Sequence, residues 1–157
     1  MRGVYTLLIY LNECKNVKVG SLGKFAFPSG FYSYTGSAMG FGAQSLGGRV
    51  SRHILKAKRL KWHIDWLLAV EEARIVSFFT RRSDQRLECI INQAIKNSCG
   101  GKVLFPRFGA SDCRSSCVSH LLYFGERSPL NGIKEVYRKV LENLPERSKP
   151  CNKKERT

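Results

Sequence analysis

The sequence predicts an α+β fold, within the broad α/β class, in which a small mixed or antiparallel central sheet is flanked by helices. Two observations support this prediction. Early runs such as residues 3–12 and 31–38 are rich in β-branched and aromatic residues, which favour strands. The pattern then changes, because Leu46, Val50 and Ile54 recur at the four-residue spacing of one helix face.

The first elements are predicted to follow one another as three strands. Residues 15–20 alternate polar and apolar side chains, and together with residues 3–12 they predict a hairpin around Asn12 to Lys15. Pro28-Ser29-Gly30 is a turn signal that introduces the third predicted strand, residues 31–38.

The later elements alternate between helices and strands. They are a short helix at 62–70, a strand at 73–82, a helix at 86–97 ended by Gly100-Gly101, a strand at 119–125 and a helix at about 129–144. We expect residues 1–144 to form one domain and the polar, basic residues 145–157 to form a flexible tail.

The chain is strongly basic. Among its 157 residues, 27 Lys and Arg oppose 12 Asp and Glu, which gives a formal charge of +15. Such an excess indicates a polyanionic partner, and DNA is the leading candidate, with RNA not excluded. The alternative is a small basic protein that is not an enzyme.

No membrane association is expected, and the oligomeric state is left open. The apolar run at residues 4–11 is too short to span a bilayer, and no small-residue cleavage site follows it. The six cysteines would suit disulfides in a secreted protein, but without a signal peptide we expect reduced thiols in the cytoplasm.

Basic residues are concentrated between positions 49 and 61, a stretch that contains no acidic residue. A solvated helix face usually interleaves both signs, and so this stretch indicates contact with phosphate. Arg52, Lys56 and Arg59 would share one stripe if the helix continued that far. The expected nucleic-acid-binding residues are Arg52, Lys56, Lys58, Arg59 and Lys61.

Two tripeptides, Gly3-Val4-Tyr5 and Tyr34-Thr35-Gly36, lie on the first and third predicted strands. Arg49 lies on the next predicted helix, and Glu88 lies on a later helix after a further strand. This order of motifs and elements resembles that of the GIY-YIG nuclease superfamily.

A longer series of blocks resembles one branch of that superfamily, the Uri superfamily endonucleases. This branch is a small archaeal domain of unknown function that is sometimes fused to endonuclease III. The blocks are PSGFYSYTGSA, GGRVSRH, WHIDWLL, LEC, FGASDC and SHLLYF. The resemblance implies a metal-dependent endonuclease that hydrolyses DNA phosphodiester bonds in DNA repair or processing.

Glu88 is the carboxylate expected to hold the metal. Phosphodiester hydrolysis needs an activated water, a group that stabilises phosphoryl charge and help for the leaving alkoxide. In the resembling family a Glu on this helix binds one divalent ion, and oxygen ligation suits Mg²⁺ or Mn²⁺. The alternative is a surface Glu in the first turn of a helix, where the helix dipole favours it.

Arg49 and His53 lie one helical turn apart on the same face. The Arg guanidinium can direct two donors at a phosphate, and so it suits stabilisation of the phosphoryl transition state. The Arg-x-x-x-His spacing found in some GIY-YIG enzymes implies that His53 positions the water or the leaving group. Alternatively, His53 contacts phosphate or only packs.

Tyr5 and Tyr34 are the motif tyrosines, which the resemblance casts as a general base and as an orienter of water or phosphate. An ordinary tyrosine is too weakly basic at neutral pH, so the base role requires a lowered pKa. Alternatively, both are half-buried strand aromatics. Tyr32 is expected on the same strand face and is an accessory candidate.

The chain departs from the family pattern at two points. Ser37 follows the second motif, where many GIY-YIG enzymes have Lys, and no Asn matches the one that many place beyond the Glu helix. Asn92, one turn after Glu88, is a candidate on geometry alone. These departures favour the alternative function, a non-catalytic nucleic-acid-binding module with the same fold.

Cys113, Cys117 and His120 form a second group of candidate residues. Their side chains suit zinc, and a fourth ligand would come from Cys99, His63 or Asp112. The family block is usually Ser-Asp-Cys-x-Cys-x-Ser-His, and this chain has two more residues between its cysteines. We favour a structural or substrate-contacting role over zinc, with Asp112 and His120 as accessory residues and a zinc-stabilised interaction domain as a further alternative.

His63 and Asp65 lie two residues apart in an apolar frame. We expect a buried hydrogen bond between them that locks the short helix, in preference to a catalytic role.

Overall fold

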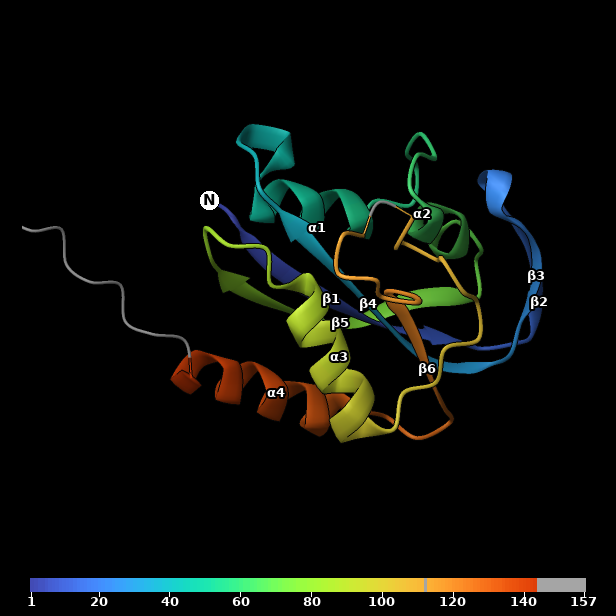
Figure 1. Ribbon diagram of the computed structural model, residues 1–157. Helices are drawn as coiled ribbons and strands as arrows, with labels where there is room; N and C mark the ends of the chain where they lie inside the picture. The colour runs from blue at the N-terminus through green and yellow to red at the C-terminus, as the bar shows by residue number, and fades with distance from the viewer. Residues whose placement is uncertain (112, 144–157) are drawn as a thin grey trace, which may run out of the picture.

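The computed structural model describes residues 1–111 and 113–143 (Figure 1). The expected tail at 145–157 and the accessory candidate Asp112 lie outside the described residues. The elements in chain order are β1 (Gly3–Leu11), β2 (Lys15–Val19), the 3-10 turn η1 (Gly20–Leu22), β3 (Gly23–Phe27), β4 (Gly30–Ala38), the 3-10 turn η2 (Gly42–Gln44), α1 (Leu46–Ile54), α2 (His63–Leu68), β5 (Ala73–Arg82), α3 (Glu88–Cys99), β6 (Leu121–Gly125) and α4 (Leu130–Asn143).

The main sheet has the strand order β5-β1-β4-β6, and all of its neighbouring pairs are antiparallel. β1 is central and buried almost throughout, which explains its continuous apolar sequence. In the β1–β4 pair, Tyr5 lies opposite Gly36, so the two tripeptides are neighbours. The predicted α+β class with an antiparallel central sheet is confirmed.

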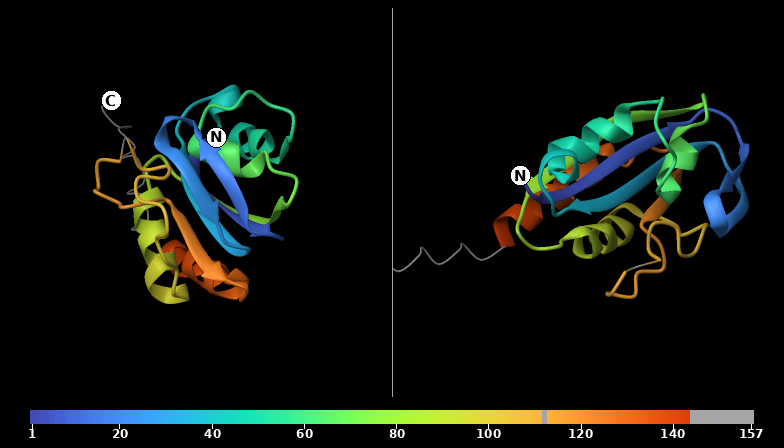
Figure 2. Two further views of the ribbon diagram at one scale, coloured as in Figure 1. Left: turned by 90° about the vertical axis from the view of Figure 1, so that its right-hand side faces the viewer. Right: turned by 90° about the horizontal axis from the view of Figure 1, so that it is seen from above.

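Helices cover both faces of this sheet (Figures 1 and 2). On one face, α1, α2 and the β2–β3 ribbon enclose a core that includes Leu7, Val50 and Leu67. On the other face, α3 and α4 enclose a second core with Leu8 and Ile91. Successive residues of β1 therefore point into two different cores.

The predicted hairpin between residues 3–12 and 15–20 is wrong. β2 pairs with β3, a strand that the sequence prediction missed, while β1 pairs with β4 and β5. The physical reason is burial, because β1 is apolar on both faces and needs a neighbour on each side, whereas β2 exposes alternate residues. The second tripeptide therefore lies on the fourth strand.

Helix α1 ends at Ile54, before the basic stripe is complete. Leu55 has an extended backbone, and the Lys58 ammonium donates to the carbonyl oxygens of Arg52 and His53 in the last turn. A cation is favourable at a helix C-terminus. Arg52, Lys56 and Arg59 consequently do not share one helix face.

None of the helices in residues 1–111 and 113–143 has both the length and the apolar character needed to cross a bilayer.

Candidate functional site

A cleft lies where β4 extends beyond its neighbour β6. β6 pairs with β4 only from Phe31 to Tyr34, whereas β4 continues to Ala38. α1 approaches this part of the strand from one face of the sheet, and α3 approaches it from the other (Figure 1). The cleft has a volume of about 330 Å³ and is lined by Tyr5, Tyr34, Gly36, Ser37, Arg49, Lys61, Trp62, His63, Arg86, Glu88, Gly109, Ser111 and His120.

The cleft brings together most of the predicted catalytic residues. Tyr5, Tyr34, Arg49 and Glu88 all line it, and His53 lies directly behind Tyr5. Tyr32 does not line it, because its buried hydroxyl donates to the carbonyl oxygen of Pro28 at 2.6 Å.

Tyr5 is buried and paired with His53. Its hydroxyl oxygen lies 2.9 Å from Nε2 of His53. Burial raises the pKa of Tyr5 to about 12, although the charge of Arg49 opposes this shift. The lowered pKa that a base role for Tyr5 requires is therefore not provided by the protein residues around it.

His53 is uncharged at neutral pH. Burial lowers its pKa from 6.5 to about 4, and the neighbouring cations, Lys58 first, act in the same direction, while Asp65 opposes them. Its Nε2 lies beside the Tyr5 hydroxyl, and its buried Nδ1 has no hydrogen-bond partner in the described part of the chain. A neutral imidazole next to a tyrosine hydroxyl can accept its proton.

Gly36, the last residue of the second tripeptide, makes room for Tyr5. A Cβ atom at this position would lie 2.6 Å from the Tyr5 hydroxyl oxygen, closer than packed atoms approach. Gly109 does the same for Tyr34, since a Cβ there would lie 2.7 Å from the Tyr34 ring, and its φ of +66° is a conformation that favours glycine. The two glycines permit both tyrosine rings to lie close to backbone.

Arg49 presents its guanidinium to the cleft. The group stacks over the Trp62 ring at 4.8 Å and donates to the Gln44 side-chain oxygen at 3.0 Å. Its Nε is buried and has no hydrogen-bond partner in the described residues. The stacking on Trp62 and the hydrogen bond to Gln44 therefore hold the guanidinium in place at the wall of the cleft.

Glu88 begins α3 and directs its carboxylate toward the end of β4. The Ser37 hydroxyl donates to one carboxylate oxygen, and the Arg86 guanidinium lies 3.7 Å from the other. Ser37 thus orients the Glu88 carboxylate. The cleft carries three cations, Arg49, Lys61 and Arg86, against this carboxylate.

Asp65 anchors α2 to α1. Its fully buried carboxylate accepts hydrogen bonds from Arg52 at 2.8 and 2.9 Å and from the backbone N–H groups of Lys61 and Trp62. Burial opposes its ionisation, but these hydrogen bonds outweigh burial and lower the pKa of Asp65. His63 makes a separate contact, in which its Nδ1 accepts from the Gly109 N–H at 3.0 Å.

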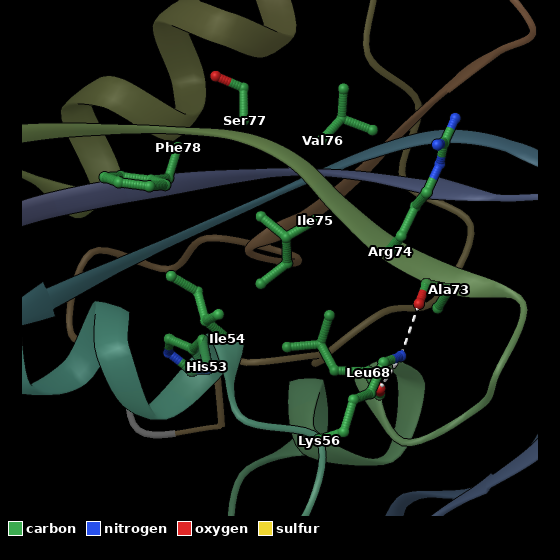
Figure 3. A pocket seen from close by; sticks show the side chains of 10 residues that line it. All are labelled: His53, Ile54, Lys56, Leu68, Ala73, Arg74, Ile75, Val76, Ser77 and Phe78. Carbon is green, nitrogen blue, oxygen red and sulfur yellow. Dashed lines mark hydrogen bonds between the residues drawn. The ribbon is translucent and has the colours of Figure 1, made fainter.

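Lys56 lies away from the cleft, beside a second hollow of about 570 Å³ between the end of α1 and β5 (Figure 3). Its ammonium donates to the carbonyl oxygens of Leu68, Val70 and Ala73 at 2.7 to 3.1 Å. Lys58 and Arg52 likewise donate to backbone carbonyl oxygens, so these three cations stabilise the backbone around the end of α1. Of the five predicted nucleic-acid contacts, Lys61 lines the cleft, and Arg59 is exposed nearby.

A cluster of metal-ligating side chains lies next to the cleft. It consists of Cys89, Cys113, Cys117 and His120, whose ligand atoms all lie within 4.8 Å of one another, and it could hold a metal ion. Two of these residues, Cys117 and His120, are buried. Cys89, at the start of α3, is the member that the sequence prediction missed.

The fold and the cleft define a mixed α+β domain with a cationic cleft at an open sheet edge. The sequence model of one protein family, described as "Domain of unknown function DUF123", matches residues 4–142, and the chain belongs to this family. Neither a curated protein nor a solved structure is similar enough to the chain to count as a match.

Proposed function

We propose that this protein is an endonuclease of the GIY-YIG type, in the Uri branch, that hydrolyses DNA phosphodiester bonds in DNA repair or processing. The observation that carries the proposal is the meeting of Tyr5, Tyr34, Arg49 and Glu88 in one cleft, although they come from four different elements. The chemistry of these side chains matches the requirements of phosphodiester hydrolysis.

The charges of the cleft suit a phosphate. Arg49, Lys61 and Arg86 give its walls an excess of positive charge, which attracts DNA and stabilises charge that grows on the phosphoryl oxygens. Arg49 is best placed for the second role because Trp62 and Gln44 hold its guanidinium in position.

Glu88 would hold a divalent ion, Mg²⁺ or Mn²⁺. A single carboxylate suits Mg²⁺, which usually keeps several waters and takes its other ligands from substrate phosphates. Such an ion supplies Lewis-acid stabilisation of the phosphoryl oxygens and of the leaving group. Ser37 orients the Glu88 carboxylate for this task.

Tyr5 and His53 would together remove the proton of the attacking water. The Tyr5 oxygen accepts the water proton while the Tyr5 hydroxyl proton passes to Nε2 of His53, which lies 2.9 Å away. Tyr5 then stays neutral throughout, which accords with its raised pKa. The positive charge ends on the imidazole, where burial and the neighbouring cations disfavour it, so His53 is a weak final acceptor of the proton. Tyr34 would orient the water or the phosphate.

The second candidate function is a non-catalytic nucleic-acid-binding module. The raised pKa of Tyr5 favours it, since the tyrosine alone is a poor base. Ser37 also favours it, because many GIY-YIG enzymes have Lys at this position. Asn92, the candidate for the missing catalytic Asn, is buried and its amide donates to the Ser119 carbonyl oxygen, which is a structural contact.

A cleavage assay separates the two functions. Wild-type protein and Glu88→Ala are incubated with duplex, flap and damaged DNA, and with matched RNA, in the presence of Mg²⁺ or Mn²⁺, and binding is measured in parallel. The proposal expects cleavage by the wild type and by the control variant Glu13→Ala, whose exposed carboxylate lies before β2. If wild type and Glu88→Ala bind the nucleic acids equally and neither protein cleaves them, the alternative of a non-catalytic nucleic-acid-binding module is correct.

A further inference from the structure

Four soft ligands converge at the point where α3 begins. Cys89 comes from α3, and Cys113, Cys117 and His120 come from the segment before β6. The Cys89 sulfur lies 3.3 Å from the Cys113 sulfur and 3.7 Å from Nε2 of His120, and no pair of ligand atoms is more than 4.8 Å apart. In a tetrahedral zinc site two sulfurs lie about 3.7 Å apart and a sulfur and a nitrogen about 3.5 Å apart, within this range.

The ligand types select the metal. Three thiolates and one imidazole suit zinc, whereas Mg²⁺ and Mn²⁺ prefer oxygen. Four protein ligands complete a tetrahedron and leave no open position for water or substrate, which is the arrangement of a structural site.

The surroundings of the sulfurs also suit a metal-bound state. The Gln93 amide approaches the Cys117 sulfur at 3.7 Å, and the backbone N–H groups of Cys117 and Ser115 donate to the Cys113 sulfur. Ser116 has a φ of +57°, which turns the chain so that both cysteines reach the same point. Hydrogen bonds to ligand sulfurs are a usual feature of the outer shell of metal–thiolate sites.

The segment that carries these ligands has little secondary structure of its own. Between the end of α3 and the start of β6, the described residues contribute only an isolated bridge at Lys102, which pairs with Tyr123. Such a long connection is uncommon in a small domain unless something holds it. A metal ion that joins it to α3 would provide that constraint.

We propose that Cys89, Cys113, Cys117 and His120 bind one structural Zn²⁺ that fastens the segment before β6 to the first turn of α3. Glu88 precedes a ligand directly, and His120 itself lines the cleft. The ion therefore fixes the wall from which the Glu88 carboxylate projects. Zinc binding does not depend on the proposed nuclease function, and metal content tests it without any cleavage assay.

Metal content measured on the full chain, purified without a chelator, tests this proposal. We expect about one zinc per chain for the wild type and nearly none for Cys89→Ser and Cys117→Ser. Cys14→Ser and Cys99→Ser are matched controls that should keep the zinc, because neither sulfur belongs to the cluster. His120→Ala should lose the ion, and His120→Cys, which supplies a fourth thiolate, should retain it.

A second measurement decides the matter if the variants do not fold. Wild-type protein reconstituted with Co²⁺ should show the intense visible bands of tetrahedral cobalt–thiolate coordination. Wild type that stays without zinc after exposure to a zinc salt, iron in place of zinc, or a Cys89–Cys113 disulfide in the native protein would each overturn the proposal.

Discussion

The cleft and the cysteine cluster begin at adjacent residues, Glu88 and Cys89, yet they are built for different ligands. The cleft has one carboxylate, several cations and an open side toward solvent. The cluster has three thiols and an imidazole, two of its members are buried, and all four ligand atoms lie close together. The first turn of α3 thus carries a hard oxygen ligand, Glu88, next to a soft sulfur ligand, Cys89.

This difference assigns different tasks to the two sites. Under the two proposals, the four ligands of the cluster would keep their ion permanently and contribute to folding, while the cationic cleft would bind anions only transiently. Variants in the cleft should therefore change cleavage and leave zinc content alone, whereas variants in the cluster should change zinc content and stability.

Arg49→Ala should give the largest effect confined to the cleft. Loss of one preorganised donor to a phosphoryl oxygen should reduce the single-turnover cleavage rate by about 10²- to 10³-fold. Arg74→Ala removes the same charge from β5, outside the cleft, and serves as the control. An equal loss of rate in both variants would show that only net charge matters. A loss of zinc in Arg49→Ala would contradict the prediction that variants in the cleft leave the zinc content unchanged.

Asp65→Ala should destabilise the wall of the cleft without affecting the cluster. It leaves the Arg52 guanidinium and two backbone N–H groups without their buried acceptor, which should cost about 3–5 kcal/mol in urea unfolding. Glu135→Ala, which removes an exposed partner of Arg138, should cost less than about 1 kcal/mol. A cost for Asp65→Ala as small as that of the control would contradict the anchoring role.

His53 should make the wall of the cleft sensitive to acid. Its pKa lies near 4 in the folded protein against an ordinary 6.5, so the unfolded chain binds the proton more readily. The contribution of His53 to the free energy of unfolding should be fully present above pH 6.5. It should fall by about 3 kcal/mol as the pH drops to 4. Comparison with His53→Gln, in which the cluster is unchanged, isolates this contribution; parallel pH curves would show that His53 is not held neutral.

Lys61 and Lys56 should differ in how they affect DNA binding. Lys61→Gln should lower the slope of log affinity against log salt concentration by about 1, because an exposed cation in the cleft is lost. Lys56→Gln should leave the slope unchanged, since its ammonium is bound to three carbonyl oxygens. A reversed result would place the DNA path along β5 and not in the cleft.

The elements with strong periodicity could be predicted from the sequence. Local pattern alone predicts the strand at residues 3–12, the helix after residue 44 and the glycine that ends α3. In each case the pattern of apolar residues or the capping residue lies within the element itself. β3 could not be found in this way. Its residues Gly23–Phe27 are few, follow a 3-10 turn and pair with a strand that is itself half exposed.

The candidate site was predicted in part for a similar reason. Tyr5, Tyr34, Arg49 and Glu88 stand in recognisable motifs, and all four line the cleft. Cys89 was missed because the other members of the cluster come from a distant segment without regular structure. The spacing of these residues in the sequence therefore does not predict that they meet. The use of Lys56 and Lys58 to bind carbonyl oxygens was equally hidden, since it depends on where α1 ends.

The most direct test of the two-site account is one experiment on Glu88→Gln. Zinc content, DNA affinity and Mg²⁺-dependent cleavage are measured on the same preparation, beside the wild type. The account predicts unchanged zinc, nearly unchanged DNA affinity and cleavage reduced to the level seen without Mg²⁺. Cleavage by Glu88→Gln at the wild-type rate would contradict it.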